Sequence, residues 1–224
     1  MAADRLLRRS ARSYSQAGED LIARFALREL GIMRPYYLDI GAHHPTWLSN
    51  TYFFYRRGSH GVCVEADPKL NRKIQRRRRR DLCLNVAIGT EDGTATLHVM
   101  RTSTLSTISA ASVSEYTELG RRERREVQVP MLTPATLLRE HCTRKPNLVS
   151  LDIEGIDLEV LNAWDFDVAR PELFIVETLT FTKQRQLARK REEIAALMAD
   201  RGYFVYGDTR VNTVFVDERA WAAT

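Results

Sequence analysis

The sequence predicts an α/β fold built on a Rossmann-like, mostly parallel sheet. Two short apolar runs, residues 36–40 and 61–65, have the composition of strands buried on both faces. Asp39 and Glu65 lie at the ends of these runs, about one β-α-β unit apart. In doubly wound sheets, an acidic residue at the end of the second strand accepts hydrogen bonds from the ribose hydroxyls of a bound nucleoside. The spacing therefore predicts a nucleoside site at the carboxyl edge of the sheet.

The rest of the chain alternates between helical and strand patterns, as such a sheet requires. Ser15 is a suitable N-cap, and Glu19 supports the first turn of a helix that runs to about residue 30. The expected apolar stripe of this helix comprises Leu21, Ile22, Phe25, Ala26 and Leu30. A closing hairpin is expected from the last two strands. The expected helices cover residues 15–30, 45–57, 68–79, 133–141, 157–164 and 183–201, and the expected strands cover 36–40, 61–65, 82–87, 147–152, 173–176, 203–206 and 211–216.

Length and composition limit the classes to which the protein can belong. The 224 residues suit one domain, which we expect over 15–224 after a basic arm at 1–14. No apolar run approaches the roughly 20 residues of a membrane span, and the N-terminus lacks the apolar segment of a secretory signal. The three cysteines show no metal-binding spacing and fit small core residues. Cytoplasm is the expected compartment.

Residues 89–130 form an insertion between the third and fourth of these strands. Residues 94–100 alternate like a hairpin strand, 103–114 are rich in Ser, Thr and Ala, and 115–126 are heavily charged. We expect an extra hairpin plus a mobile segment over the pocket, where a substrate lid would lie. An ordinary exposed insertion explains the composition equally well.

The loop after the first strand excludes one class of ligand. A dinucleotide site needs three closely spaced glycines so that a pyrophosphate can lie on a helix N-terminus. Here residues 41–46 read Gly-Ala-His-His-Pro-Thr, with one glycine and two imidazoles. A nucleoside with a cationic tail, such as S-adenosylmethionine, suits Asp39 and Glu65 better. The alternative is a plain turn with a surface glutamate.

Five segments, taken in order along the chain, together form a recognisable pattern: residues 15–20, 38–45, 49–51, 64–68 and 151–155. In these segments the chain resembles the FkbM-type S-adenosylmethionine-dependent methyltransferases. The resemblance implies a class I methyltransferase fold, with a seven-stranded sheet whose last strand is antiparallel. It also implies an O-methyltransferase that modifies a hydroxyl of a sugar, a polyketide or another secondary metabolite. The His-His-Pro of the first loop departs from the glycine-containing loop of the family.

The resemblance and the strand ends together nominate the cofactor site. Asn85 and Ala87 follow the third strand, where this fold class reaches the adenine edge. The resemblance also implies that Glu19 and Asp20 face the cofactor pocket, although their spacing fits helix-capping residues equally well. The expected cofactor-binding residues are Gln16, Asp39, Gly41, Ala42, His43, Asn50, Glu65, Ala66, Asp67, Asn85, Ala87 and Asp152.

The acceptor chemistry needs a proton acceptor. An alcohol has a pKa far above neutrality, so its methylation needs a general base or a metal that acidifies it. The catalytic candidates at the carboxyl edge of the sheet are His44, Asp152 and Glu154, and His43 and Glu177 are further candidates. Asp152 and Glu177 end adjacent strands and could converge on Mg²⁺. Asn212 could add an oxygen to this metal site or be a plain strand-edge residue.

Two other functions compete with this one. The net charge of +5 and the run Arg72–Arg80 suit an RNA methyltransferase with a basic surface, although no aromatic platform accompanies the arginines. The five arginines of Arg76–Arg80 fit either a solvated helix face or a phosphate or acidic-substrate contact. A non-catalytic nucleoside-binding protein is the third reading. The expected partner is a small-molecule or glycan acceptor rather than nucleic acid, and a homo-oligomer is left open.

Overall fold

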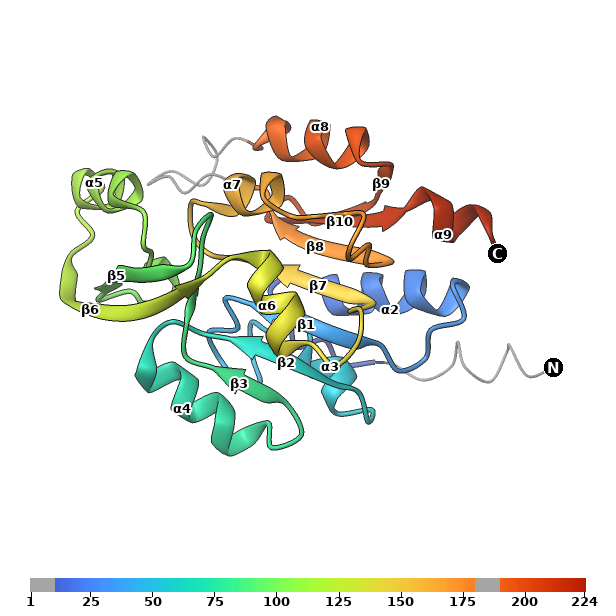
Figure 1. Ribbon diagram of the computed structural model, residues 1–224, viewed down its shortest axis with the longest axis horizontal. Coiled ribbons are helices and arrows are strands. Elements are labelled where there is room, and N and C mark those ends of the chain that lie inside the picture. The colour runs from blue at the N-terminus through green and yellow to red at the C-terminus, as the bar shows by residue number, and fades with distance from the viewer. Residues whose placement is uncertain (1–10, 180–189) are drawn as a thin grey trace.

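The computed structural model describes residues 11–179 and 190–224, and it shows a seven-stranded sheet with a smaller sheet at one end (Figure 1). β10 runs antiparallel to β8 and to β9, whereas β3, β2, β1, β7 and β8 are parallel. The predicted fold class is confirmed, with the last strand antiparallel. In spatial order the strands are β3 (Leu82–Leu84), β2 (His60–Val64), β1 (Tyr36–Ile40), β7 (Leu148–Leu151), β8 (Leu173–Glu177), β10 (Asn212–Asp217) and β9 (Tyr203–Asp208).

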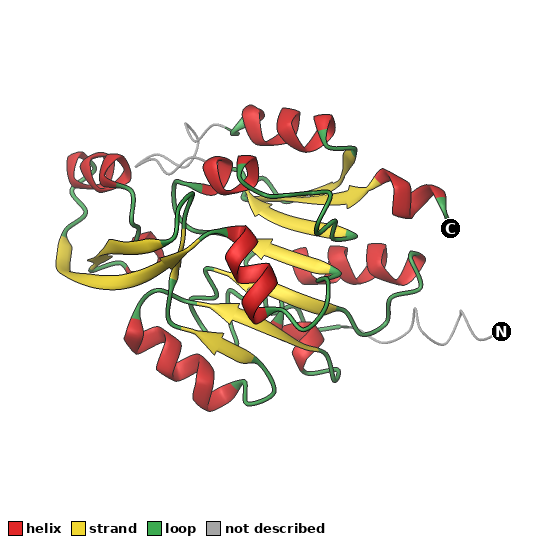
Figure 2. Ribbon diagram, in the orientation of Figure 1, coloured by secondary structure: helices red, strands yellow, loops and turns green. Residues whose placement is uncertain are grey.

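Helices cover both faces of this sheet because alternate side chains of each strand bury on opposite sides (Figure 2). In β1, Leu38 packs with the helices α6 (Pro134–His141), α7 (Asp157–Asn162) and α8 (Glu192–Asp200). Tyr37 packs on the other side with α2, α3 and α4. Those helices are α2 (Glu19–Glu29), α3 (Tyr52–Tyr55) and α4 (Pro68–Arg77), and α9 (Glu218–Ala222) ends the chain.

The predicted helix at 45–57 is wrong. Only the four residues of α3 are helical there, and residues 41–51 form a long loop after β1. His43 and Leu48 have φ values of 46° and 50°, in the left-handed region that an α-helix cannot contain. This loop, rather than a helix, therefore borders the carboxyl end of β1.

The first helix also begins later than predicted. α2 starts at Glu19, and its N-cap is Gly18 at φ 98°, not Ser15. Ser15 Oγ still accepts hydrogen bonds from the backbone N–H groups of Gly18 and Asp20. Phe25 is 48% exposed and is the only member of the predicted apolar stripe that does not pack inward. Ala26 is buried, and Leu21, Ile22 and Leu30 are half-buried against the same core. The apolar residues that this helix buries are Ala23, Ala26 and Leu27.

Two later predictions need correction. The strand expected at 82–87 divides into β3 and β4 (Ala87–Ile88), which belongs to the smaller sheet. The helix expected at 183–201 is helical only over α8 in its described part, and 183–189 lie outside the described residues. Most of the predicted basic arm, residues 1–10, also lies outside them. None of the described helices combines the length and the apolar character that a membrane crossing requires.

The insertion forms a second small sheet at the end to which the parallel strands point (Figure 1). β6 (Glu123–Leu132) is its middle strand, parallel to β4 and antiparallel to β5 (Gly93–Met100). The segment expected to be mobile contains two helices, η1 (Ser103–Leu105) and α5 (Ala110–Glu118). The insertion is therefore a layer with its own secondary structure, and it faces the carboxyl edge of the main sheet.

Candidate functional site

A cavity of about 550 Å³ lies between the carboxyl edge of the main sheet and the insertion. Gly41, Glu65 and Glu177 line it from the ends of β1, β2 and β8. Residues 103–108 of the insertion form part of the opposite wall, together with Leu97 and Arg121. Ligands of open α/β sheets bind outside the carboxyl ends of the strands, and this cavity occupies that position.

Glu65 is held in place by two backbone donors. His43 N–H donates to Oε2 and Asp67 N–H donates to Oε1, each at 2.8 Å. Burial raises the pKa of Glu65 to about 7, and these two hydrogen bonds oppose the increase. Each carboxylate oxygen can accept a further hydrogen bond. Glu65 thus presents two fixed hydrogen-bond acceptors to the cavity, the number needed to bind the two hydroxyls of a ribose.

Gly41 allows the loops after β1 and β7 to meet. It has φ 83°, and a Cβ at this position would lie 1.8 Å from the carbonyl oxygen of Asp152. No larger residue fits without moving the backbone of one of the loops. The close approach brings the end of β1 beside the acidic loop of residues 152–155.

Three carboxylates converge on this side of the cavity. Ligand oxygens of Asp152, Glu154 and Glu177 lie within 4.8 Å of one another. Burial, and then repulsion from Asp157, raise the pKa of Asp152 to about 7, while a hydrogen bond from Glu177 opposes this. Burial and repulsion from Asp152 raise the pKa values of Glu154 and Glu177 well above their usual range. At neutral pH this cluster, hereafter the acidic cluster, retains protons.

Neighbouring groups fix the shape of the acidic cluster. Asp157 accepts hydrogen bonds from the backbone N–H groups of Ile153 at 3.0 Å and Gly155 at 3.3 Å, and Arg191 lies 3.4 Å from its Oδ2. Glu154 has φ 56°, an uncommon conformation for a residue other than glycine. The hydroxyl of Tyr116 donates to Glu154 Oε2 at 2.9 Å. The insertion therefore holds one carboxylate of the cluster directly.

Several predicted site residues lie in the cavity. His43 lines it with one ring nitrogen 3.0 Å from Ser103 Oγ, while its buried Nδ1 has no hydrogen-bond partner among the described residues. Burial and the neighbouring His44 lower the pKa of His43, so its ring is neutral at pH 7. The predicted residues that line the cavity are Gln16, Gly41, His43, Glu65, Ala66, Ala87, Asp152, Glu154 and Glu177.

Other predicted site residues have structural partners instead. His44 does not line the cavity, because its Nδ1 accepts hydrogen bonds from the backbone of Thr46 and Trp47 and completes a turn. Asn85 donates to the backbone oxygens of Glu65 and Ala66, two residues that line the cavity, and so supports this part of the cavity wall.

Four further predicted residues do not line the cavity. Ala42 packs in the core, and Asp67 is the N-cap of α4. Asn50 donates to Ser150 Oγ at 3.1 Å, and Asn212 donates to Glu19 Oε1 at 3.0 Å. These side chains act on the polypeptide around the cavity rather than inside it.

Asp39 belongs to a buried ion pair that the sequence did not reveal. Its carboxylate accepts a hydrogen bond from Thr51 Oγ1 and lies 3.4 Å from Arg78 Nη1. Arg78 Nε lies 2.7 Å from Asp81, and the Arg78 side chain is 0% exposed. One member of the arginine run is thus a core residue and cannot contact a phosphate. The other four, residues 76, 77, 79 and 80, are exposed.

Sequence reasoning missed the insertion side of the site. Tyr116, Thr107 and Arg121 lie within or beside the cavity, yet none stands in a recognisable motif. The composition of residues 103–126 pointed only to a polar insertion. The insertion contacts residues 152–155 although the two segments are more than thirty positions apart in the sequence. One such contact is the 2.8 Å hydrogen bond from Thr107 Oγ1 to the carbonyl oxygen of Glu154.

Comparison with known proteins identifies the family of the chain. Among solved structures, Burkholderia thailandensis 1,6-didemethyltoxoflavin-N1-methyltransferase, with bound 1,6-didemethyltoxoflavin and S-adenosylhomocysteine, superposes with a TM-score of 0.43. It has 12% sequence identity and covers 89% of this chain and 76% of that chain. No curated protein sequence matches the chain. The methyltransferase FkbM domain model matches residues 39–205, more than half of the sequence. The chain belongs to the FkbM family of S-adenosylmethionine-dependent methyltransferases.

Proposed function

We propose that the protein is an O-methyltransferase that acts on a hydroxyl of a sugar, a polyketide or another small secondary metabolite. The observation that supports this most directly is the acidic cluster, which lines the same cavity as Glu65. S-adenosylmethionine supplies an activated methyl group, so the protein must align the acceptor and remove its proton. The cluster provides the group for that second task.

The residues on the donor side fit a nucleoside with a cationic tail. Glu65 presents two acceptors to the ribose, and Gly41 allows close approach to the backbone. Ala66 and Ala87 leave an apolar surface where an adenine can lie. The acidic cluster favours a positively charged ligand over an anionic one, which also weighs against a nucleic-acid backbone in this cavity.

Asp152 is the proposed general base. Its pKa of about 7 matches the requirement that a base titrate near the working pH. Burial, and then repulsion from Asp152, raise the pKa values of Glu154 and Glu177 well above their usual range, so these two carboxyls are the proposed hydrogen-bond donors that orient the acceptor. His44, a catalytic candidate from the sequence, lies in the turn after β1 and has no such role in this proposal.

The same carboxylates could instead be metal ligands. Oxygen atoms of Asp152, Glu154 and Glu177 form a set of hard ligands that Mg²⁺ prefers. Asn212, considered as a further ligand, is bonded to Glu19. Magnesium dependence is therefore proposed as a variant of the same chemistry, in which the cation replaces the retained protons.

Binding of S-adenosylhomocysteine tests the donor site. We expect calorimetric binding in the wild type and at least about tenfold weaker binding in Glu65→Gln, because the amide loses a charged acceptor for ribose. Glu91→Gln, which changes an exposed turn residue, is the matched control and should bind normally. Repeating the titration with Mg²⁺ tests metal dependence. Equal binding in wild type and Glu65→Gln would overturn the assigned nucleoside site.

Transfer of a labelled methyl group tests the reaction. A panel of hydroxyl-bearing sugars and phenols is incubated with labelled S-adenosylmethionine, and NMR identifies the methylated atom. We expect an O-methyl product, with transfer reduced by about 10²–10⁴-fold in Asp152→Asn at unchanged S-adenosylhomocysteine affinity. A product methylated on nitrogen or carbon would contradict the O-methyl assignment while leaving the donor site intact.

A further inference from the structure

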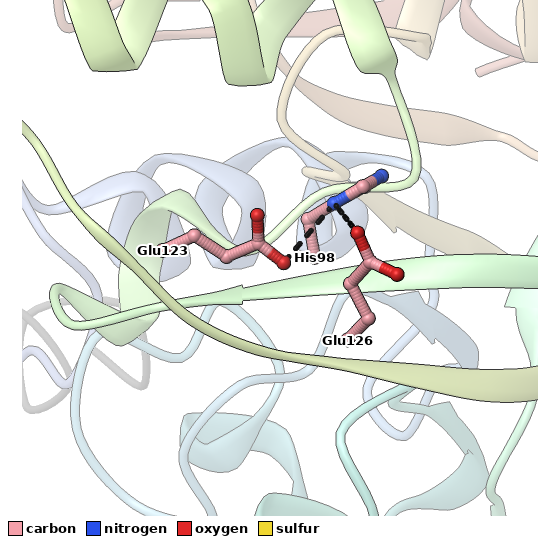
Figure 3. Close-up of side chains that lie close together, drawn as sticks. All are labelled: His98, Glu123 and Glu126. Atoms are coloured by element: carbon pink, nitrogen blue, oxygen red, sulfur yellow. Dashed lines mark hydrogen bonds and ion pairs between the residues drawn. The ribbon is translucent and has the colours of Figure 1, made fainter.

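A second cluster of metal-ligating side chains lies outside the cavity, on the insertion. His98 of β5 and Glu123 and Glu126 of β6 point toward one another on one face of the small sheet (Figure 3). We propose that these three residues form a binding site for a divalent transition metal, with Zn²⁺ as the best-fitting ion. This site is separate from the proposed methyl-transfer chemistry.

A β-bulge creates the cluster. His98 and Glu126 are direct cross-strand partners, so their side chains share a face. Glu123 is three residues from Glu126 and in a regular strand would lie on the opposite face. The register shifts between Val99 and Met100, so that β6 passes over one residue and Glu123 pairs with Met100. Bulges re-aim side chains in this way, and here the bulge returns Glu123 to the face of His98.

The distances match a metal site more closely than a set of hydrogen bonds. His98 Nδ1 lies 3.3 Å from Glu123 Oε1 and 3.6 Å from Glu126 Oε1. Both separations are long for a charge-assisted hydrogen bond, which is usually about 2.7–2.9 Å. Ligand atoms around a tetrahedral Zn²⁺, with bonds of about 2.0–2.2 Å, lie about 3.3–3.6 Å apart. Both carboxylates face the same ring nitrogen, as Figure 3 shows.

The ligand chemistry selects the ion. An imidazole nitrogen with two carboxylates suits Zn²⁺, whereas Mg²⁺ and Ca²⁺ prefer sets of oxygens only. Three protein ligands leave one tetrahedral position for water. The His98 side chain is 17% exposed and Glu126 is 61% exposed, so an ion can enter from solvent.

The backbone of His98 links this site to the cavity wall. His98 N–H donates to the carbonyl of Thr107 at 2.9 Å, and Thr107 N–H donates back at 3.3 Å. The hydroxyl of Thr107 donates to the carbonyl of Glu154 at 2.8 Å. A metal that joins β5 to β6 would therefore hold the strand that supports this wall of the cavity.

Calorimetric titration of untagged protein with ZnCl₂ tests the site. We expect one Zn²⁺ per chain in the wild type, and binding weaker by at least about tenfold in His98→Gln and in Glu126→Gln, since each change removes a ligand. His60→Gln, on the exposed start of β2, is the matched histidine control and should bind normally. Co²⁺ should give the intense visible spectrum of tetrahedral coordination in the wild type, and that spectrum should be lost in His98→Gln.

The acidic cluster is tested in the same series. Glu177→Gln should leave Zn²⁺ binding unchanged, because it removes a carboxylate from the cavity and not from the insertion. Absence of Zn²⁺ binding in the wild type, equal binding in His98→Gln, or loss in Glu177→Gln alone would each overturn the proposal. If circular dichroism shows that His98→Gln does not fold, the test depends on Glu126→Gln, because the Glu126 side chain is largely exposed and its replacement should not disturb folding.

Discussion

Two groups of carboxylates differ in how their charge is balanced. Asp39 of β1 and Asp81, just before β3, have buried side chains, whereas Asp152, Glu154 and Glu177 are half-buried at the ends of β7 and β8. Asp39 and Asp81 share the guanidinium of Arg78, which also donates to Thr51 Oγ1 at 2.7 Å. In the described part of the chain, no ion pair joins Asp152, Glu154 or Glu177 to a basic side chain. The first group is closed to solvent, and the second lines the cavity.

The difference indicates that the Asp39 and Asp81 carboxylates stabilise the fold, whereas the carboxyl groups of the acidic cluster are suited to proton transfer. A buried carboxylate with a cation and hydrogen-bond donors stays ionised and fixes the packing around it. A buried carboxylate beside others of its kind keeps a proton, and its pKa moves toward neutrality, where proton transfer is efficient. Burial also raises the pKa of Asp39, but Arg78 and Thr51 oppose the shift.

Removing the shared cation should have the largest effect. Arg78→Ala leaves Asp39 and Asp81 buried without a counter-charge, so we expect the free energy of unfolding to fall by about 3–5 kcal/mol. Arg77→Ala, one position earlier and exposed, should change it by less than about 0.5 kcal/mol. Urea unfolding measures both. Equal effects of the two variants would mean that Arg78 is not a structural core residue.

Removing a carboxylate from the acidic cluster should stabilise the protein, but only at high pH. Folding raises the pKa values of Asp152 and Glu177, so the folded state binds protons more tightly than the unfolded state. The stability is therefore present at low pH and is lost as pH rises toward and through about 7, the pKa of Asp152.

Glu177→Gln should accordingly raise the melting temperature at pH 8 by about 2–4 °C, the effect of about 1 kcal/mol in a chain of this size. At pH 4, below the ordinary pKa of a glutamate, we expect almost no gain, because the carboxyl is then largely protonated in the unfolded wild type as well as in the folded one. Thermal unfolding across this pH range measures the difference, with Glu91→Gln as the exposed control. A gain of equal size at both pH values would contradict the retained protons.

The contact between the insertion and the acidic cluster should have the smallest effect. Tyr116→Phe removes the hydroxyl that donates to Glu154 at 2.9 Å, and we expect it to lower the free energy of unfolding by about 0.5–1 kcal/mol. Amide exchange should also accelerate in α5. Tyr52→Phe is the control, because its hydroxyl makes no hydrogen bond with the described residues. No change in exchange would show that this bond does not anchor the insertion.

Local signals allowed the sequence to predict the main sheet. The apolar runs at 36–40 and 61–65, the proline-initiated helices α4 and α6, and the position of Glu65 depend on neighbours within a few residues. The helix predicted at 45–57 failed because left-handed residues in that loop carry no compositional mark. The same limit applied to Ser15, which lies three residues before the N-cap Gly18, although its Oγ accepts hydrogen bonds from the N–H groups of Gly18 and Asp20.

The sequence by itself determined the fold class, the family and the edge of the sheet where the site lies. Strand periodicity and the order of the motifs are properties of the linear chain, and they predicted which strands end at that edge. Only the tertiary structure decided that Arg78 is buried, that His44 is a turn residue, and that a bulge gathers His98 with two glutamates. Each of these outcomes depends on burial and on partners from distant segments, and a side chain acquires its charge state only when those segments pack together.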